Sequence, residues 1–283
     1  MIQILILGGA GFLGKQISNF LKDKAKIVIF DKKKLDGIES RIVNVSDLKE
    51  LKKNYLDFNF DIVIDLINTQ GITKTRDNFN YSYQTNIITL KNIIKCCSIN
   101  KAKLIYTSSA AVYGITKKIP IDENFDLNPV NEYGFFKEFS ENIIINEFNI
   151  NYTILRIFNI YTKEKGFGII NHFFECIEEK KKINLFGINQ LRDYIHIEDL
   201  LNIIYKVCLN QKTNNQILNV GSGKGISTKE ILDIFLKYYD IKYNIEEIEI
   251  EYNSVANISK IKKIINFKPK NIIEELKIRL KND

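Results

Sequence analysis

The chain opens with Met1-Ile2-Gln3-Ile4-Leu5-Ile6-Leu7-Gly8-Gly9-Ala10-Gly11-Phe12-Leu13-Gly14, in which an apolar run leads directly into a glycine-rich turn. The run predicts a buried strand, and the periodic residues 12–22 predict a helix. Strand, glycine turn and helix in this order are typical of a dinucleotide site. Glycines let the backbone approach a pyrophosphate, and amides at the helix start stabilise its charge. The segment therefore predicts cofactor contacts from Gly8, Gly11, Phe12, Leu13 and Gly14.

Apolar runs rich in Ile, Val and Leu alternate with helix-like stretches along most of the chain. The expected strands lie at 2–7, 26–30, 61–67, 103–107 and 153–157, and the expected helices at 12–22, 86–99 and 134–148. This alternation predicts an α/β fold, a Rossmann-like doubly wound parallel sheet with helices on both faces. Later elements are expected at 168–180, 183–186, 193–197, 199–210, 217–220, 227–239 and 270–281.

The expected domains are a cofactor-binding Rossmann domain at 1–165 and a smaller C-terminal, mainly substrate-binding lobe at 166–283. The strands near 193–197 and 217–220 are expected to join the sheet of the first domain. No Pro- or Gly-rich linker separates the two.

Composition narrows the class of protein. The chain has 283 residues, 45% of them hydrophobic, and no apolar stretch approaches the ~18 residues of a membrane span. Its first residues lack the basic region and cleavage site of a secretory signal, which favours the cytoplasm. The net charge of +7 is spread along the chain without an aromatic-interleaved basic patch, so we expect no nucleic-acid partner. The four cysteines follow neither a metal-ligand nor a disulfide pattern, and no metal is expected.

The chemistry is indicated by Tyr133-Gly-Phe-Phe-Lys137, which lies downstream of Thr107-Ser108-Ser109. On a helix, side chains four residues apart share one face, so the Lys137 ammonium is expected near the Tyr133 phenol. A nearby cation favours the phenolate, which would let Tyr133 act as a base near neutral pH. Ser109 is placed to hydrogen-bond the same substrate hydroxyl. The alternative is a chance spacing on a helix surface.

Asp31 ends the second predicted strand, where a carboxylate accepts ribose hydroxyls and repels a 2′-phosphate. It favours NAD over NADP, although the cations at 32–34 work against that repulsion.

Taken together, these motifs make the chain resemble the extended short-chain dehydrogenase/reductases, specifically the NAD-dependent epimerase/dehydratase group that acts on nucleotide sugars. The resemblance runs nearly end to end and also rests on Asn86, the block Ser108–Gly114, Arg156 with Asn159, and Arg192–Asp199. It implies that Lys137 holds the nicotinamide ribose and that Tyr133 is the base, with Ser109 beside the substrate hydroxyl. It further implies cofactor contacts from Asn44, Val45, Leu66, Ile67 and Asn86, and substrate contacts from Tyr113, Asn159 and Arg192.

Two positions depart from the family pattern. Asn44-Val45 stands where an aspartate usually lies near the adenine, so adenine recognition is expected to use neutral hydrogen bonds. Asp65-Leu66-Ile67-Asn68 replaces a His-Leu-Ala-Ala-like turn, where backbone contacts to the cofactor are still possible.

Dehydratases of this group carry an acid pair after the active-site hydroxyl residue, because eliminating water needs a general acid and a base. This chain has Ser109-Ala110-Ala111 there, which disfavours dehydration. We expect a homodimer, formed through the helices near 86–99 and 134–148, that epimerises a nucleotide-activated hexose, with C4 as the candidate carbon, for surface polysaccharide. A reductase of a nucleotide 4-keto-6-deoxy sugar and a non-catalytic dinucleotide sensor remain alternatives.

Overall fold

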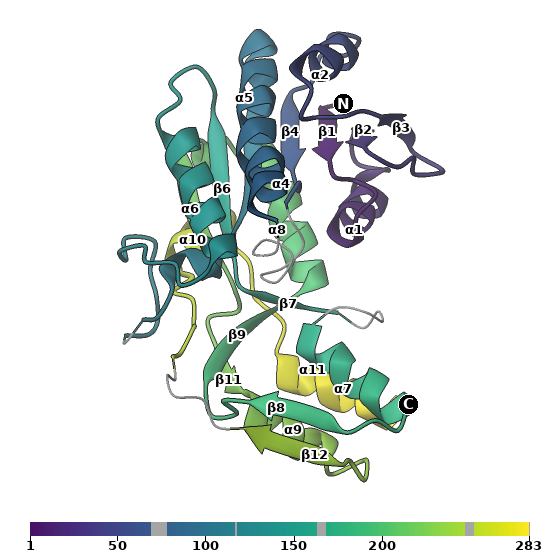
Figure 1. Ribbon diagram of the computed structural model, residues 1–283, viewed down its shortest axis with the longest axis vertical. Helices are drawn as coiled ribbons and strands as arrows, with labels where there is room; N and C mark the ends of the chain where they lie inside the picture. The colour runs from purple at the N-terminus through teal and green to yellow at the C-terminus, as the bar shows by residue number, and fades with distance from the viewer. Residues whose placement is uncertain (69–77, 117, 163–167, 247–251, 283) are drawn as a thin grey trace. The chain divides into compact units, whose positions relative to one another are not determined.

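A computed structural model describes residues 1–68, 78–116, 118–162, 168–246 and 252–282 (Figure 1). The chain divides into two compact units, between which it passes several times. The first comprises Met1–Gly114, Leu127–Arg156 and Ile204–Leu218, and the second comprises Ile115–Asp126, Ile157–Ile203 and Asn219–Asp283.

A seven-stranded sheet forms the centre of the first unit. Its strand order is β10-β6-β5-β4-β1-β2-β3, and β1 is parallel to β2 and β4, as are β2 to β3 and β4 to β5. The strands are β1 (Gln3–Leu7), β2 (Lys26–Asp31), β3 (Glu39–Ile42), β4 (Ile62–Asp65), β5 (Lys103–Ser109), β6 (Tyr152–Ile157) and β10 (Gln216–Val220). The central strands are buried along nearly their whole length, as expected when helices cover both faces. The predicted Rossmann-like fold is thus confirmed.

The helices of this unit follow the strands in the expected alternation. They are α1 (Phe12–Leu21), α2 (Leu48–Tyr55), α4 (Phe79–Tyr83), the π-helix η1 (Gln84–Ile88), α5 (Thr89–Asn100), the 3₁₀ turn η2 (Ala110–Tyr113) and α6 (Glu132–Ile145). Their apolar faces and the sheet enclose a core that includes Leu5, Val28, Val63, Ile93 and Leu104. Because α4, η1 and α5 follow one another without a break, the helix predicted at 86–99 begins earlier than its apolar pattern indicates.

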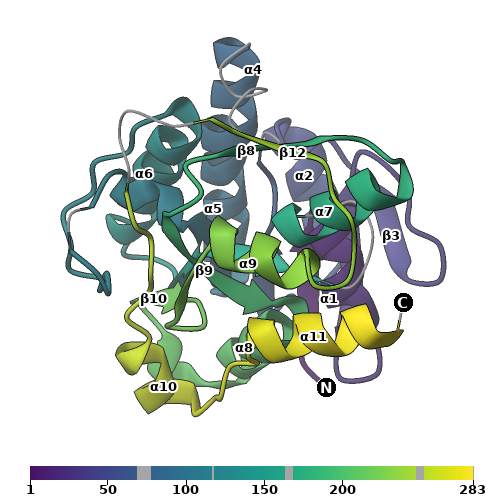
Figure 2. The same ribbon diagram turned by 90° about the horizontal axis from the view of Figure 1, so that it is seen from below.

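The second unit is built around small sheets. One has the order β11-β9-β7 and the other pairs β12 with β8. The strands are β7 (Asn159–Tyr161), β8 (Ile183–Phe186), β9 (Leu191–His196), β11 (Gly225–Ser227) and β12 (Tyr243–Glu246). Helices α7 (Gly168–Glu178), α9 (Thr228–Phe235) and α11 (Ile272–Asn282) supply much of its core, which includes Phe173, Phe235 and Leu276 (Figure 2). The other helical elements are α8 (Ile197–Leu209), which ends in the first unit, η3 (Gln211–Thr213), also of the first unit, and α10 (Ser259–Ile265).

The strand expected near 193–197 does not join the central sheet. The strand expected at 217–220 does so as β10, whereas β9 pairs parallel to β7 and antiparallel to β11. The backbone groups of β9 therefore pair with β7 and β11. Each of these strands has three residues, which is too short to show a periodicity in the sequence.

Cys96, Cys97, Cys176 and Cys208 are all buried and free. Burial raises the pKa of Cys96 to about 11 and that of Cys208 to about 12. The four thiols thus pack in the interior. In the described part of the chain, no helix is both long enough and apolar enough to cross a bilayer.

A buried lysine links the strand that carries Ser109 to the end of α8. Lys103 starts β5, and its Nζ donates to the Val207 carbonyl at 2.9 Å and to the Thr213 hydroxyl at 2.6 Å. A cation at a helix C-terminus also interacts favourably with the helix dipole. Burial nevertheless lowers the pKa of Lys103 from 10.5 to about 8.

We expect Lys103→Met to destabilise the fold, and the loss to grow as the pH rises from about 8 to 10.5. Between these values the unfolded chain binds more protons at Lys103 than the folded chain does, so the wild type gains stability with pH. The gain is at most about 3 kcal/mol, at ~1.36 kcal/mol for each pKa unit. Urea unfolding of wild type and variant at several pH values measures it, with the exposed Lys26→Met as control. If the difference in unfolding free energy between wild type and Lys103→Met became smaller with rising pH, burial would not lower the pKa of Lys103.

Candidate active site

Ser109 and Tyr133 meet where β5 ends and α6 begins. Ser109 is the last residue of β5, and its side chain accepts a hydrogen bond from the Ala111 amide at 3.2 Å. The Asn131 side chain caps α6 by accepting from the Gly134 amide at 2.9 Å. A Cβ on Gly134 would lie 2.6 Å from the Ala111 carbonyl oxygen, so glycine is required for this close approach. These features bring Tyr133 within hydrogen-bonding range of Ser109.

Lys137 lies one turn further along α6 and is only 1% exposed. Its Nζ donates to the Thr107 carbonyl at 2.7 Å and lies 4.6 Å from the Tyr106 ring centroid and 6.0 Å from that of Tyr133. Burial lowers the pKa of Lys137 to about 8, while Asp65 and Glu141 act in the opposite direction. The shared helix face predicted for Tyr133 and Lys137 is confirmed.

Burial and the neighbouring Ser109 act on the ionisation of Tyr133. Burial raises the pKa of Tyr133, and the hydrogen bond with Ser109 opposes that rise. The Lys137 ammonium donates to the Thr107 carbonyl and lies 6.0 Å from the Tyr133 ring centroid. The effect of this cation on the phenol stays a prediction.

A buried set of charges lies behind these residues and was missed by the sequence analysis. The Glu141 carboxylate accepts hydrogen bonds from Ser108 Oγ and from the Arg156 guanidinium. Asp65 is also buried, and burial raises its pKa to about 6. Glu141 lies four residues after Lys137 on α6, and this spacing could have indicated that the two side chains share a helix face.

Tyr113 belongs to the same interior network. It is buried, and its hydroxyl accepts a hydrogen bond from Arg156 Nη1 at 3.0 Å. Arg156 thus holds the Tyr113 ring in place, and the contact with the substrate that the resemblance implies for Tyr113 stays a prediction.

The predicted cofactor residues gather at the carboxyl edge of β1, β2, β3 and β4. Asp31 ends β2 and joins the glycine turn, since its Oδ2 accepts from the Ala10 amide at 3.0 Å. Leu66 and Ile67 follow β4 and lie beside Gly8, where an added Cβ would be 3.4 Å from each. Ligands of open parallel sheets bind at this edge.

Asn44 and Val45 follow β3 at the same edge. Asn44 is exposed, and its side-chain oxygen accepts from the Ser46 hydroxyl at 2.7 Å, while the buried Asn92 donates to the Val45 carbonyl at 3.2 Å. Asn86 is buried on the π-helix η1 and donates to the Ser82 carbonyl at 2.8 Å. Single π turns occur frequently at functional sites.

The glycine turn fits a bound pyrophosphate. Gly8 has a φ of 77°, which favours glycine, and Gly11 begins α1 with no side-chain cap from any described residue. Among the described residues, the only heavy atom near a Cβ on Gly11 would be the Gly8 carbonyl oxygen, at 3.3 Å, so these residues leave the space before the helix amides open to a ligand. On Gly14 a Cβ would lie 2.5 Å from Gly9 Cα, so this glycine lets the helix pack on the turn.

These geometries predict different effects for two alanine substitutions. Gly14→Ala is expected to destabilise the fold by about 1–3 kcal/mol, because backbone atoms must move. Gly11→Ala is expected to change stability by less than ~0.5 kcal/mol, yet to weaken NAD binding at least ~10-fold, because its methyl group enters the phosphate space. Urea unfolding and calorimetric titration with NAD measure the two effects. Equal affinity of Gly11→Ala and wild type would exclude a phosphate from this turn.

Two predicted substrate residues lie on paired strands of the second unit. Asn159 is opposite Tyr194 in the β7–β9 pair, and its side chain donates to the Asp193 carbonyl at 2.8 Å. Arg192 Nη1 donates to the Tyr252 carbonyl at 3.1 Å, and its guanidinium lies 4.2 Å from the Tyr252 ring centroid. Asp193 accepts from the amides of Ser222, Gly223 and Ala256, which fixes the strand next to Arg192.

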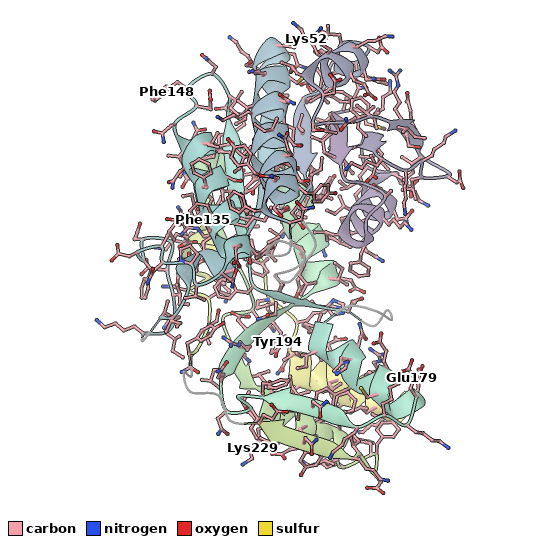
Figure 3. All side chains as sticks on the ribbon, viewed as in Figure 1. Lys52, Phe135, Phe148, Glu179, Tyr194 and Lys229 are labelled. Atoms are coloured by element: carbon pink, nitrogen blue, oxygen red, sulfur yellow. The ribbon has the colours of Figure 1, made fainter. Side chains whose placement is uncertain are left out.

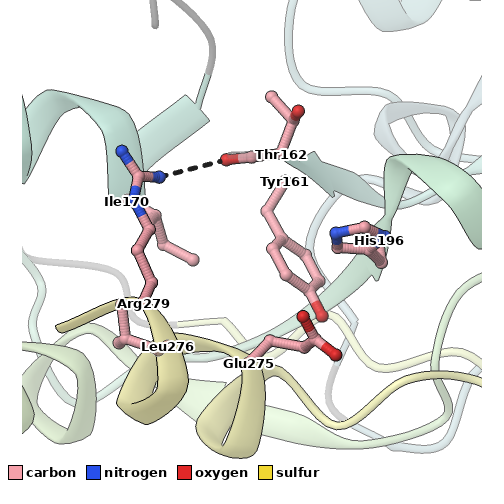
Figure 4. A pocket seen from close by; sticks show the side chains of 7 residues that line it. All are labelled: Tyr161, Thr162, Ile170, His196, Glu275, Leu276 and Arg279. Carbon is pink, nitrogen blue, oxygen red and sulfur yellow. Dashed lines mark hydrogen bonds between the residues drawn. The ribbon is translucent and has the colours of Figure 1, made fainter. Parts of the chain in front are cut away.

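His196 lies in the same unit, beside a small pocket of about 10 Å³ (Figure 4). It is buried, accepts from the Glu198 amide at 3.2 Å and packs edge-on against Tyr161. A space of this size holds one water molecule at most. These contacts are those of a histidine that packs in the interior.

Comparison with known proteins identifies the family of this chain. The family model described as the NAD dependent epimerase/dehydratase family matches residues 4–221. A putative UDP-glucose 4-epimerase of Methanocaldococcus jannaschii is 31% identical over 252 residues, which cover 82% of this chain and 81% of the relative. A GDP-6-deoxy-D-talose 4-dehydrogenase of Aggregatibacter actinomycetemcomitans is 24% identical over 263 residues, which cover 90% and 84% of the two chains.

A solved structure shares the fold over the whole length. The UDP-glucose 4-epimerase of Thermotoga maritima, crystallised with UDP-glucose, has a TM-score of 0.89 at 20% identity, covering 99% of this chain and 98% of that one. The family match, the relative at 31% identity and the glycine turn with its Ser109, Tyr133 and Lys137 set lead to one assignment. The chain belongs to the NAD-dependent epimerase/dehydratase family, a family of enzymes whose cofactor is NAD.

Proposed function

We propose that this protein epimerises a nucleotide-activated hexose, with C4 as the reacting carbon, by transient oxidation to a keto sugar. The observation that carries the proposal is the placement of Tyr133 beside Ser109, with the buried Lys137 one turn further along α6. Relatives that include a putative UDP-glucose 4-epimerase support it. An acid pair, which dehydration would need, does not follow Ser109 in the sequence.

In the proposed mechanism, Tyr133 removes the proton from the sugar hydroxyl and returns it after the keto sugar has turned over. Ser109 hydrogen-bonds the same hydroxyl and shares the proton as it moves. Bound NAD supplies the acceptor for hydride from the sugar carbon and the donor for its return. Lys137 would hold a ribose hydroxyl of the cofactor, and its positive charge would favour the phenolate of Tyr133.

The first unit is the proposed cofactor domain, and most of the second is the proposed substrate lobe. Gly8, Gly11, Phe12, Leu13 and Gly14 are proposed to hold the pyrophosphate. Asp31 is proposed to hold the adenosine ribose, with Asn44, Val45, Leu66, Ile67 and Asn86 around the rest of the cofactor. The carboxylate of Asp31 at the end of β2 disfavours a 2′-phosphate and so supports NAD over NADP.

Arg192 and Asn159 are the proposed contacts for the nucleotide diphosphate. A guanidinium donates two parallel hydrogen bonds to one anion, which suits a phosphate. Arg192 donates to the Tyr252 carbonyl and to the Gln190 side-chain oxygen and lies over the Tyr252 ring, and these contacts hold the guanidinium in place.

The test is turnover without added cofactor. Pure protein is incubated with UDP-glucose, UDP-galactose, UDP-N-acetylglucosamine and dTDP-glucose, and proton NMR follows the anomeric signals. An epimerase gives the C4 epimer in catalytic amounts, because its cofactor is regenerated in each cycle. Product that appears only with stoichiometric NADH or NADPH would contradict epimerisation.

The second candidate is a reductase of a nucleotide 4-keto-6-deoxy sugar, which uses the same residues in one direction. The similarity to a GDP-6-deoxy-D-talose 4-dehydrogenase favours it. Oxidation of NADH or NADPH in the presence of such a keto sugar, without any C4 epimer, would support this candidate.

A homodimer through α5 and α6 is also proposed. Phe135, 48% exposed, and Phe139 project from α6 with their rings stacked 6.1 Å apart, and Ile99 is exposed at the end of α5 (Figure 3). Exposed apolar groups of this kind mark interaction surfaces. Light scattering of the pure protein tests the proposal: a mass of one chain, 32.9 kDa, would contradict it.

A further inference from the structure

Three successive residues of β5 each meet a different turn of α6. The Thr107 carbonyl accepts from Lys137 Nζ, Ser108 Oγ donates to the Glu141 carboxylate, and the Ser109 side chain lies close to the Tyr133 phenol. Residues 133, 137 and 141 are spaced four apart and so lie along one helix face. The three contacts together fix the position of the helix along the strand.

Glu141 is the most deeply held of the three helix residues. It is 0% exposed, and its partner Arg156 is 3% exposed. Arg156 Nη2 lies 2.7 Å from Glu141 Oε2, and Nε lies 3.2 and 3.1 Å from the two carboxylate oxygens. A guanidinium bound in this forked manner permits one orientation of the carboxylate. The oxygen that accepts from Ser108 is therefore fixed in space.

We propose that Glu141 is a positioning residue for the reaction, which holds Ser108 and so sets the register in which Ser109 meets Tyr133 and Thr107 meets Lys137. This rests on the proposed function. Glu141 also acts on Lys137 through its charge, because it opposes the effect of burial on the pKa of that lysine.

Glu141→Gln tests the proposal, since the amide keeps the shape of the side chain and removes its charge. We expect kcat to fall about 10-fold, with KM for the nucleotide sugar changed less than about twofold, because no substrate contact is lost. The alkaline limb of the kcat–pH profile, where Lys137 loses its proton, is expected to move to lower pH by at least ~0.5 unit. Glu147→Gln, the same change just beyond the end of α6, is the control.

Ser108→Ala provides a second variant, in case Glu141→Gln does not fold. It removes the contact to the strand and leaves the Glu141–Arg156 pair intact. We expect kcat to fall about 3- to 10-fold at constant KM, while thermal unfolding shows a folded protein. The proposal would be overturned if both variants kept the wild-type kcat and the wild-type kcat–pH profile. It would also be overturned if kcat fell only in proportion to the fraction of folded protein while the kcat–pH profile stayed in place.

Carbon-13 NMR of the lysine side chains gives a readout that does not depend on turnover, with Lys137→Arg to assign the signal. The Lys137 titration is expected to move to lower pH in Glu141→Gln and to stay in place in Glu147→Gln. If the wild type turns over no nucleotide sugar but this shift is found, the proposed function fails and the link from Glu141 to Lys137 stands. An unmoved titration would overturn that link whatever the substrate.

Discussion

Tyr133→Phe is expected to lower kcat by about 10²- to 10⁴-fold, the range for losing a positioned acid–base group. The ring remains to fill its half-buried site beside Ser109, so the fold should be retained. Only the proton-transferring hydroxyl is removed. Steady-state turnover of the substrate identified by NMR measures the effect.

The exposed Tyr238→Phe is the matched control. The bound cofactor, released by denaturation and identified by mass, should be present in both variants in the wild-type amount. If Tyr133→Phe kept more than a tenth of the wild-type kcat, Tyr133 would not be the base. If that variant kept full biological activity with its cofactor bound, the result would support the alternative that the protein is a non-catalytic dinucleotide sensor.

Lys137→Ala is expected to lower kcat at least ~100-fold, because the phenol loses the cation that favours its ionised form. The effect requires bound cofactor, since in the structure the ammonium donates to the Thr107 carbonyl instead. Removing the lysine also leaves the buried Asp65 and Glu141 with less compensating charge. Turnover must therefore be normalised to the folded fraction.

Lys137→Met, which fills more of the vacated volume, separates packing from charge. It should show the same loss of kcat with a smaller loss of stability. The exposed Lys95→Ala on α5 is the control. A loss below tenfold in both Lys137 variants would mean that the lysine does not act on Tyr133.

The sequence predicts the central fold because its strands are apolar and its helices amphipathic. Other elements lack such a pattern. Strand β3, Glu39–Ile42, lies at the sheet edge and is half exposed, so its residues are largely polar. Strand β12, Tyr243–Glu246, is exposed along its length, and β7 and β11 have three residues each. These segments become strands because of the strands they pair with in the folded protein, and their own sequences do not show it.

Helix α2 was missed although a local signal was present. Asp47 caps it by accepting from the amides of Lys49 and Glu50, and aspartate at this position is a known helix start. The sequence of α2 is mostly polar, and only Leu51 and Tyr55 of its residues are buried, so the helix shows little apolar periodicity.

For the site, spacing alone predicted that Tyr133 and Lys137 share a helix face. It did not predict that Lys137 would donate to a backbone carbonyl, because that depends on where β5 passes. Nor did it identify Glu141, whose partners Ser108 and Arg156 lie on other elements. Buried charge networks join residues distant in sequence, so only the folded structure displays them.

The shielded thiols make this protein convenient for site-specific chemistry. Maleimides react with thiolates, and all four native sulfhydryls are enclosed and hard to ionise. A cysteine installed at Phe148, which is 93% exposed (Figure 3), should therefore take up a fluorophore far faster than any native position does. Single-dye conjugates could then be prepared from the otherwise unaltered chain, without first deleting its own cysteines.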